Sequence, residues 1–181
     1  MGVARNMNTT ELKALAKNEI PALSKNLSAT DVHFLIQALN EKDDTIRYNA
    51  FLLLQSNSRE FPFVYEYWSD LEKKLESPNS YQRSLGVMLI AENVRWDKDG
   101  RFSKTVSKYM NRCNDEKFIT ARQAIQGLAV ILKATDKFDD KIKQGLTNLR
   151  LSQYKENQQK LVKKDILNVL QMIKNKNMQP K

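Results

Sequence analysis

The sequence predicts an all-α protein, a right-handed α-solenoid of about four helix pairs behind an N-terminal capping helix. Five Gly and four Pro are few for an all-β protein, which needs many turns. Apolar residues recur at helical spacing along most of the chain. A helix–turn–helix joint also recurs, as LNEKDDTIRYNAFLLLQ, LESPNSYQRSLGVMLIAEN and CNDEKFITARQAIQGLAVIL.

We interpret the chain as a single domain whose ends differ from its middle. Residues 1–29 form the predicted cap, and residues 175–181 a polar, frayed tail. The polar side chains of Asn8–Thr10 suit a helix start. Pro21 interrupts this first helix because it lacks the amide donor and clashes with the preceding turn. The sequence leaves open whether Met1–Asn6 are native.

Residues 30–174 contain the predicted helix pairs. In the first pair, Ser28 or Thr30 caps a helix with an apolar stripe, and a turn at Asn40–Asp44 leads to the second helix. Pro62 suits the first turn of the next helix, where its missing amide costs nothing. Apolar stripes mark the remaining helices at Phe61–Leu75, Leu85–Ile90, Phe102–Met110, Ile125–Leu132, Phe138–Leu149 and Leu161–Ile173.

An arginine recurs in the first turn of the second helix of each pair. Arg47 and Arg83 are 36 residues apart, Arg122 follows after 39, and Lys160 takes the fourth position after a further 38. The repeat is close in two copies and faint in the last, as expected where terminal repeats cap a stack. We expect the arginine to bond carbonyls of the preceding loop or a carboxylate of the neighbouring repeat.

A small residue accompanies the arginine. Ala50 and Gly86 follow it by three residues, and Ala124 by two. Because a small side chain lets two helices approach closely, we predict that Gly86→Leu lowers the free energy of unfolding by about 1–3 kcal/mol through overpacking. A thermal melt checks this prediction, and an unchanged melting temperature would show that Gly86 does not face another helix.

This pattern resembles HEAT repeats, in which an acidic turn leads to an arginine and then to an alanine three residues on. The matching residues are Asp43, Asp44, Arg47 and Ala50 in the first copy, Arg83 and Gly86 in the second, and Asp115, Glu116 and Arg122 in the third. The resemblance covers residues 30–174 and implies a structural repeat without catalytic chemistry. The middle of the chain is also similar to a group of small uncharacterised repeat proteins of Gram-positive bacteria.

The sequence offers little for cofactor chemistry or membrane insertion. Its single cysteine, Cys113, excludes an intramolecular disulfide and a cysteine-clustered metal site, which favours a reducing cytoplasm. It has no glycine-rich phosphate loop, and no apolar stretch of signal-peptide or membrane-spanning length. We therefore expect a cytoplasmic protein without cofactor or metal.

No catalytic constellation is evident, and we expect a protein that is not an enzyme. His33, the only histidine, lies in an apolar stretch far from Cys113 in the predicted stack. Trp96 and Asp97 resemble, in residue type, a pair on the concave basic surface of some helical-repeat DNA glycosylases that act on alkylated bases. That resemblance implies base stacking by the indole and stabilisation of a cationic sugar by the carboxylate. The alternative is that Trp96 anchors the end of a repeat.

Charge is distributed unevenly and bears on the partner. The net charge is +9, with 9 Lys/Arg against 11 Asp/Glu in residues 1–80 and 21 against 10 in residues 81–181. We expect an interaction module that presents a curved surface to another protein, with nucleic acid as the alternative partner. The candidate interaction residues are Tyr48, Asn49, Gln82, Gln123 and Gln126. The candidate phosphate-binding residues are Arg122, Lys133, Lys155, Lys160, Lys163 and Lys164.

Overall fold

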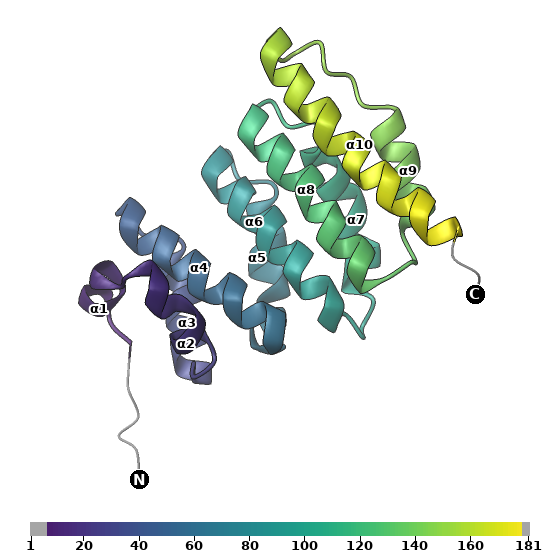
Figure 1. Ribbon diagram of the computed structural model, residues 1–181. Coiled ribbons are helices and arrows are strands. Elements are labelled where there is room, and N and C mark those ends of the chain that lie inside the picture. Colours follow the sequence, from purple (N-terminus) through teal and green to yellow (C-terminus); the bar gives the residue numbers. More distant parts are fainter. Residues whose placement is uncertain (1–6, 179–181) are drawn as a thin grey trace. The chain divides into compact units, whose positions relative to one another are not determined.

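Figure 1 shows the computed structural model, which describes residues 7–178. The regular elements of this part of the chain are all helices, so the all-α prediction is confirmed. Contacts divide the protein into two compact units, Met1–Trp68 and Ser69–Lys181. The N-terminal residues 1–6, whose origin the sequence leaves open, and residues 179–181 of the expected tail lie outside the described residues.

The first unit is built around its longest helix, α4. Its elements are α1 (Thr9–Ala14), η1 (Lys17–Glu19), α2 (Ile20–Ser24), α3 (Ala29–Ala38), α4 (Asp44–Glu60) and η2 (Phe63–Tyr67). Helix α4 contacts α1, α2, α3 and η2. Short polar side chains start the helices as expected: Asn8 caps α1, Ser28 caps α3 and Asp43 caps α4, each accepting a backbone N–H.

Two asparagines of α4 hold the N-terminal helices. The Asn49 amide donates to the carbonyls of Leu12, at 2.9 Å, and Leu15, at 3.4 Å, where α1 ends. The Asn57 amide donates to the carbonyl of Ser24, at 2.8 Å, at the end of α2. Asn49 is only 5% exposed, so the prediction that it faces outward is wrong. It is buried because the last carbonyls of a helix need donors from outside that helix.

The aromatic run after Pro62 differs from the single α-helix that was predicted. Phe63–Tyr67 forms the 3₁₀ helix η2, and the α-helix begins only at Trp68. Such turns are common where α-helices start. Phe63 is 43% exposed and stacks on Phe61, with the ring centroids 5.6 Å apart.

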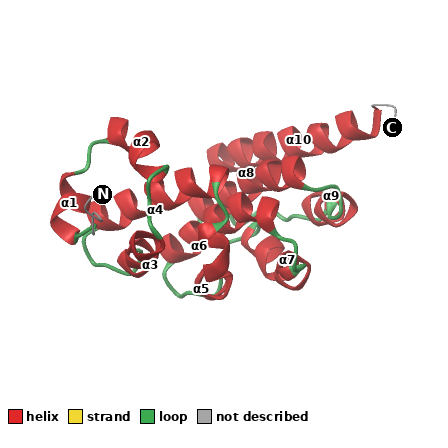
Figure 2. Ribbon diagram, turned by 90° about the horizontal axis from the view of Figure 1, so that it is seen from below, coloured by secondary structure: helices red, strands yellow, loops and turns green. Residues whose placement is uncertain are grey.

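The second unit consists of three consecutive helix pairs. Its elements are α5 (Trp68–Lys74, which begins at the boundary), α6 (Ser80–Asn93), η3 (Val94–Trp96), α7 (Arg101–Arg112), α8 (Phe118–Ala134), α9 (Asp139–Thr147) and α10 (Glu156–Met178). Helix α8 packs along both α6 and α10, and these three lie side by side in Figure 1. Figure 2 shows α5, α7 and α9 as a second row. Helix α10 continues past Asn175, where the tail was expected to begin.

Gly86 faces a neighbouring helix, as its predicted role requires. A Cβ added to Gly86 would lie 3.0 Å from the Lys74 Cβ and 3.2 Å from the Leu71 carbonyl oxygen. Both atoms belong to α5, and neither is the end of a flexible side chain. The expected overpacking by Gly86→Leu therefore has a definite origin.

Candidate functional site

The recurring arginine binds the loop before its own helix in two copies of the joint. Arg47 Nη1 donates to the carbonyls of Glu41 (2.8 Å) and Lys42 (3.1 Å). Arg83 Nη1 donates to the carbonyls of Ser77 (2.9 Å) and Pro78 (3.1 Å), at the same two offsets along the chain. The prediction that this arginine bonds loop carbonyls is confirmed for both residues.

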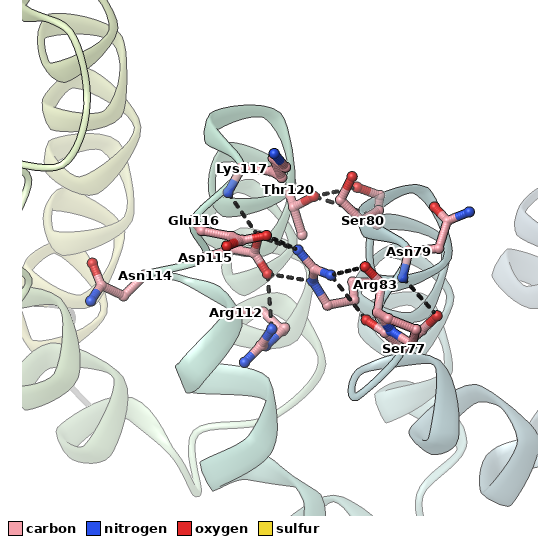
Figure 3. A network of polar contacts seen from close by, with 12 residues as sticks. Ser77, Asn79, Ser80, Arg83, Arg112, Asn114, Asp115, Glu116, Lys117 and Thr120 are labelled. Atoms are coloured by element: carbon pink, nitrogen blue, oxygen red, sulfur yellow. Dashed lines mark hydrogen bonds and ion pairs between the residues drawn. The ribbon is translucent and has the colours of Figure 1, made fainter.

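Arg83 also reaches the next joint, where the Asp115 carboxylate accepts hydrogen bonds from the Nε and Nη2 groups of Arg83 (Figure 3). Arg83 Nε lies 2.7 Å from Asp115 Oδ2, and Nη2 lies 2.8 Å from Oδ1. Asp115 further accepts from Arg112 Nη1 and from the backbone N–H of Lys117, both at 2.9 Å. The Asp115 side chain is 0% exposed, so this is a buried, fully bonded carboxylate.

The same loop is tied to the following one. The Tyr154 hydroxyl donates to the Asp115 carbonyl oxygen, and the Gln153 amide donates to the Asn114 carbonyl at 3.2 Å. Both donors come from the segment between α9 and α10. The loops that join α5 to α6, α7 to α8 and α9 to α10 are thus connected in sequence along one edge of the second unit.

Arg122, in the third copy, departs from this arrangement. Its Nε lies 2.6 Å from Asp165 Oδ2 on α10 and its Nη2 3.2 Å from Oδ1, while the Gln126 amide donates to the same Oδ1 at 3.2 Å. The predicted bond to a carboxylate of the neighbouring repeat is therefore present. Because Asp165 neutralises its charge, Arg122 is less available to a phosphate than its sequence position suggested.

The remaining candidate interaction residues differ in their exposure. Tyr48 is 41% exposed, and the Lys17 amine lies 5.6 Å from its ring centroid. Gln82 is half-buried, and its side-chain oxygen accepts from the Lys74 amine at 2.5 Å. Burial lowers the pKa of Lys74 to about 8. Gln123 is half-buried with an unbonded side-chain oxygen, so Tyr48 and Gln126 are the exposed members of the set.

The candidate phosphate-binding lysines all lie at the surface. Lys133 is on α8 and Lys155 precedes α10, while Lys160, Lys163 and Lys164 are on α10; each is exposed. Lys160 pairs with Glu156 at 3.3 Å. Within residues 7–178, Lys163 and Lys164 have no acidic partner.

Sequence patterning missed three exposed apolar side chains of the second unit. Ile119 on α8 is 57% exposed, and Leu161 and Leu167 on α10 are 41% and 65% exposed. Both leucines belong to the predicted apolar stripe Leu161–Ile173 of the fourth pair, and the expectation that this whole stripe is covered is wrong for them. Hydrophobic spacing alone does not distinguish an apolar side chain that is covered by a neighbouring helix from one that is exposed.

The residues singled out for chemistry have structural partners. Asp97 accepts the N–H groups of Arg101 (2.8 Å) and Phe102 (2.9 Å) with its two oxygens, and so bonds the first turn of α7. His33 lies beside Tyr67, with Nδ1 3.3 Å from the hydroxyl. Cys113 is buried, and this burial raises the pKa of its thiol.

Residues 7–178 contain neither a metal-holding cluster nor a membrane-spanning helix. No group of three or more His, Cys, Asp or Glu side chains there is placed to hold a metal ion. No helix in the same range is long and apolar enough to span a bilayer. Comparison with protein-family models, with curated proteins and with solved structures finds no match to the chain. The resemblance to HEAT repeats therefore stays a prediction.

Proposed function

We propose that the protein is a non-enzymatic interaction module, a right-handed α-solenoid of about four HEAT-like helix pairs that presents a curved surface to another protein. The observation that carries this proposal is the packing of α8 along both α6 and α10. The ion pairs Arg83–Asp115 and Arg122–Asp165 each link one helix pair to the next. Stacked second helices of this kind form the binding surfaces of repeat proteins.

The exposed part of α8 has the composition of a protein interface. Ile119 is exposed, and Arg122, Gln126 and Lys133 follow it at intervals of three, four and seven residues on the same side of the helix. Leu161 is exposed at the corresponding end of α10. Apolar side chains beside an arginine already held in place are typical of interface centres, which exclude most other charged groups.

Purification of the protein with its companions from its native cells tests the proposal. We expect the wild type to retain a reproducible set of proteins and Ile119→Glu to lose it, because the charge would be buried at the interface. Ser103→Glu on α7 adds the same charge at another exposed position and serves as the control. If the wild type, Ile119→Glu and Ser103→Glu all co-purify with the same proteins, the proposal is contradicted.

Nucleic acid is the second candidate partner, favoured by the charge of the second unit. Residues 69–181 contain 23 Lys/Arg and 13 Asp/Glu, a net charge of +10. Lysines that neutralise phosphates release counterions, which makes binding fall steeply with salt. A gel-shift assay with DNA and RNA at two salt concentrations distinguishes the candidates, because affinity that hardly changes with salt excludes phosphate-driven binding.

A further inference from the structure

A groove lies between the last two helices of the second unit. Its volume is about 350 Å³, and Lys143 and Thr147 of α9 face Leu170 and Lys174 of α10 across it. Ile173, which is only 2% exposed, lies at its base. The groove therefore combines an apolar base with a lysine on each side.

The groove continues into a stripe along α10. Lys163, Leu167, Leu170 and Lys174 are spaced by four, three and four residues, which places them on one face of the helix. Leu167 is 65% exposed at the middle of this stripe. A pair of leucines between two lysines matches the apolar seam of a helix that packs against another helix.

The charges around the groove are predominantly positive. Lys143, Lys163 and Lys174 have no acidic partner in the described range 7–178. Both acidic residues of α10 are engaged elsewhere, Glu156 by Lys160 and Asp165 by Arg122. On α9, Asp139 pairs with Lys176, which leaves Asp140 as the exposed carboxylate one turn before Lys143.

We propose that this groove binds an acidic amphipathic helix of a partner protein. Apolar side chains of that helix cover Leu167 and Leu170, and its flanking Glu or Asp residues meet Lys143, Lys163 and Lys174. The inference rests on the proposed function as an interaction module and specifies its partner. A second copy of the same face is disfavoured because lysines would oppose lysines. Phosphates would satisfy the lysines but leave the leucines in water.

An unbiased library of displayed peptides tests the proposal with the full-length protein as bait. The peptides are about 14 residues long, which allows four helical turns. We expect the selected pool to be acidic and to carry apolar residues three or four positions apart. A pool that is not enriched, or that is neutral or basic, would overturn the proposal.

Three variants then locate the binding of a selected peptide, measured by fluorescence anisotropy. Leu167→Gln and Lys174→Glu are each expected to weaken binding at least about tenfold, which corresponds to about 1.4 kcal/mol. Lys104→Glu on α7 makes the same charge change at another exposed position and should leave affinity within about twofold, as expected for a distant surface charge. All three residues are exposed, so the fold should persist, and circular dichroism checks this.

The pattern across the variants separates the possible outcomes. Equal weakening by Lys104→Glu and Lys174→Glu would indicate general charge attraction and reject a defined groove. Competition by duplex DNA together with full affinity of Leu167→Gln would indicate a phosphate site instead. Loss of native companions in Ile119→Glu, with no peptide effect at Leu167, would preserve the interaction module and reject this groove.

Discussion

Asp115→Ala is expected to lower the free energy of unfolding by about 3–5 kcal/mol, because it leaves the Arg83 guanidinium buried without its carboxylate. The Arg83 side chain is 5% exposed, and Asp115 accepts from it at 2.7 and 2.8 Å. The substitution also removes the acceptor of Arg112 and of the Lys117 N–H. Urea-induced unfolding followed by circular dichroism measures the change.

Glu116 supplies a matched control in the next position. Its side chain is 74% exposed and its carboxylate lies 3.6 Å from Arg83 Nη2. Exposed ion pairs contribute little, so Glu116→Ala should change the free energy of unfolding by less than about 1 kcal/mol. Equal effects of the two substitutions would contradict the central role of Asp115 in the joint.

The stability difference between the wild type and Asp115→Ala should also depend on pH. Burial by itself raises the pKa of Asp115, but the hydrogen bonds from Arg83 and Lys117 and the nearby arginine charges outweigh burial and hold the pKa below its ordinary value. A carboxyl whose pKa is lowered by folding stabilises the protein above the unfolded pKa, and this contribution is lost as the pH falls through the folded pKa. The stability gap between wild type and Asp115→Ala should therefore be constant near neutrality and shrink below about pH 4.

The joints could be predicted from the sequence because each depends on local chemistry. Asp43 and Ser28 are short polar residues immediately before an apolar stripe, which is sufficient to identify a helix start. The carbonyl bonds of Arg83 followed from its recurrence at the position of Arg47. The sequence could not show which of the two adjacent acids, Asp115 or Glu116, is the main partner of Arg83. That depends on the packing of the helices, which buries Asp115 and leaves Glu116 exposed.

The surface could not be predicted as well, because burial depends on neighbours that are remote in sequence. From the sequence, Asn49 is expected to face outward because it is polar. In the fold it is buried, because its amide donates to the carbonyls of Leu12 and Leu15. Leu161 and Leu167 fit an apolar stripe but belong to a helix with one face open. Periodicity identifies the faces of a helix, whereas the identity of what covers each face is tertiary information.

Gly127→Ala is expected to lower the free energy of unfolding by about 2–3 kcal/mol through overpacking. The added Cβ would overlap the Tyr109 hydroxyl oxygen and lie 3.1 Å from the Ala91 Cβ. Tyr109 is 0% exposed, and its hydroxyl donates to the Ala124 carbonyl at 3.0 Å. Because the ring is rigid, buried and hydrogen-bonded, α7 or α8 must shift to admit a single methyl group.

Tyr109→Phe removes the clash and makes the prediction specific. Alone, this substitution removes one buried hydrogen bond and should lower the free energy of unfolding by about 1 kcal/mol. With the hydroxyl gone, the nearest ring atom to the new Cβ is Tyr109 Cζ at 3.5 Å, an ordinary contact. Adding Gly127→Ala to Tyr109→Phe should then cost much less stability than Gly127→Ala costs in the wild type, because only the 3.1 Å contact with the Ala91 Cβ remains, so the two substitutions are non-additive in chemical denaturation.

Gly145→Ala is the control for a clash that costs little. Its Cβ would lie 2.5 Å from the Met110 Cε, the end of a flexible side chain that can rotate away. Alanine is also favoured over glycine within a helix, so this substitution should be neutral or mildly stabilising. If Gly127→Ala were equally neutral, or if Tyr109→Phe failed to rescue it, the close contact between α7 and α8 would not be what excludes a side chain at position 127.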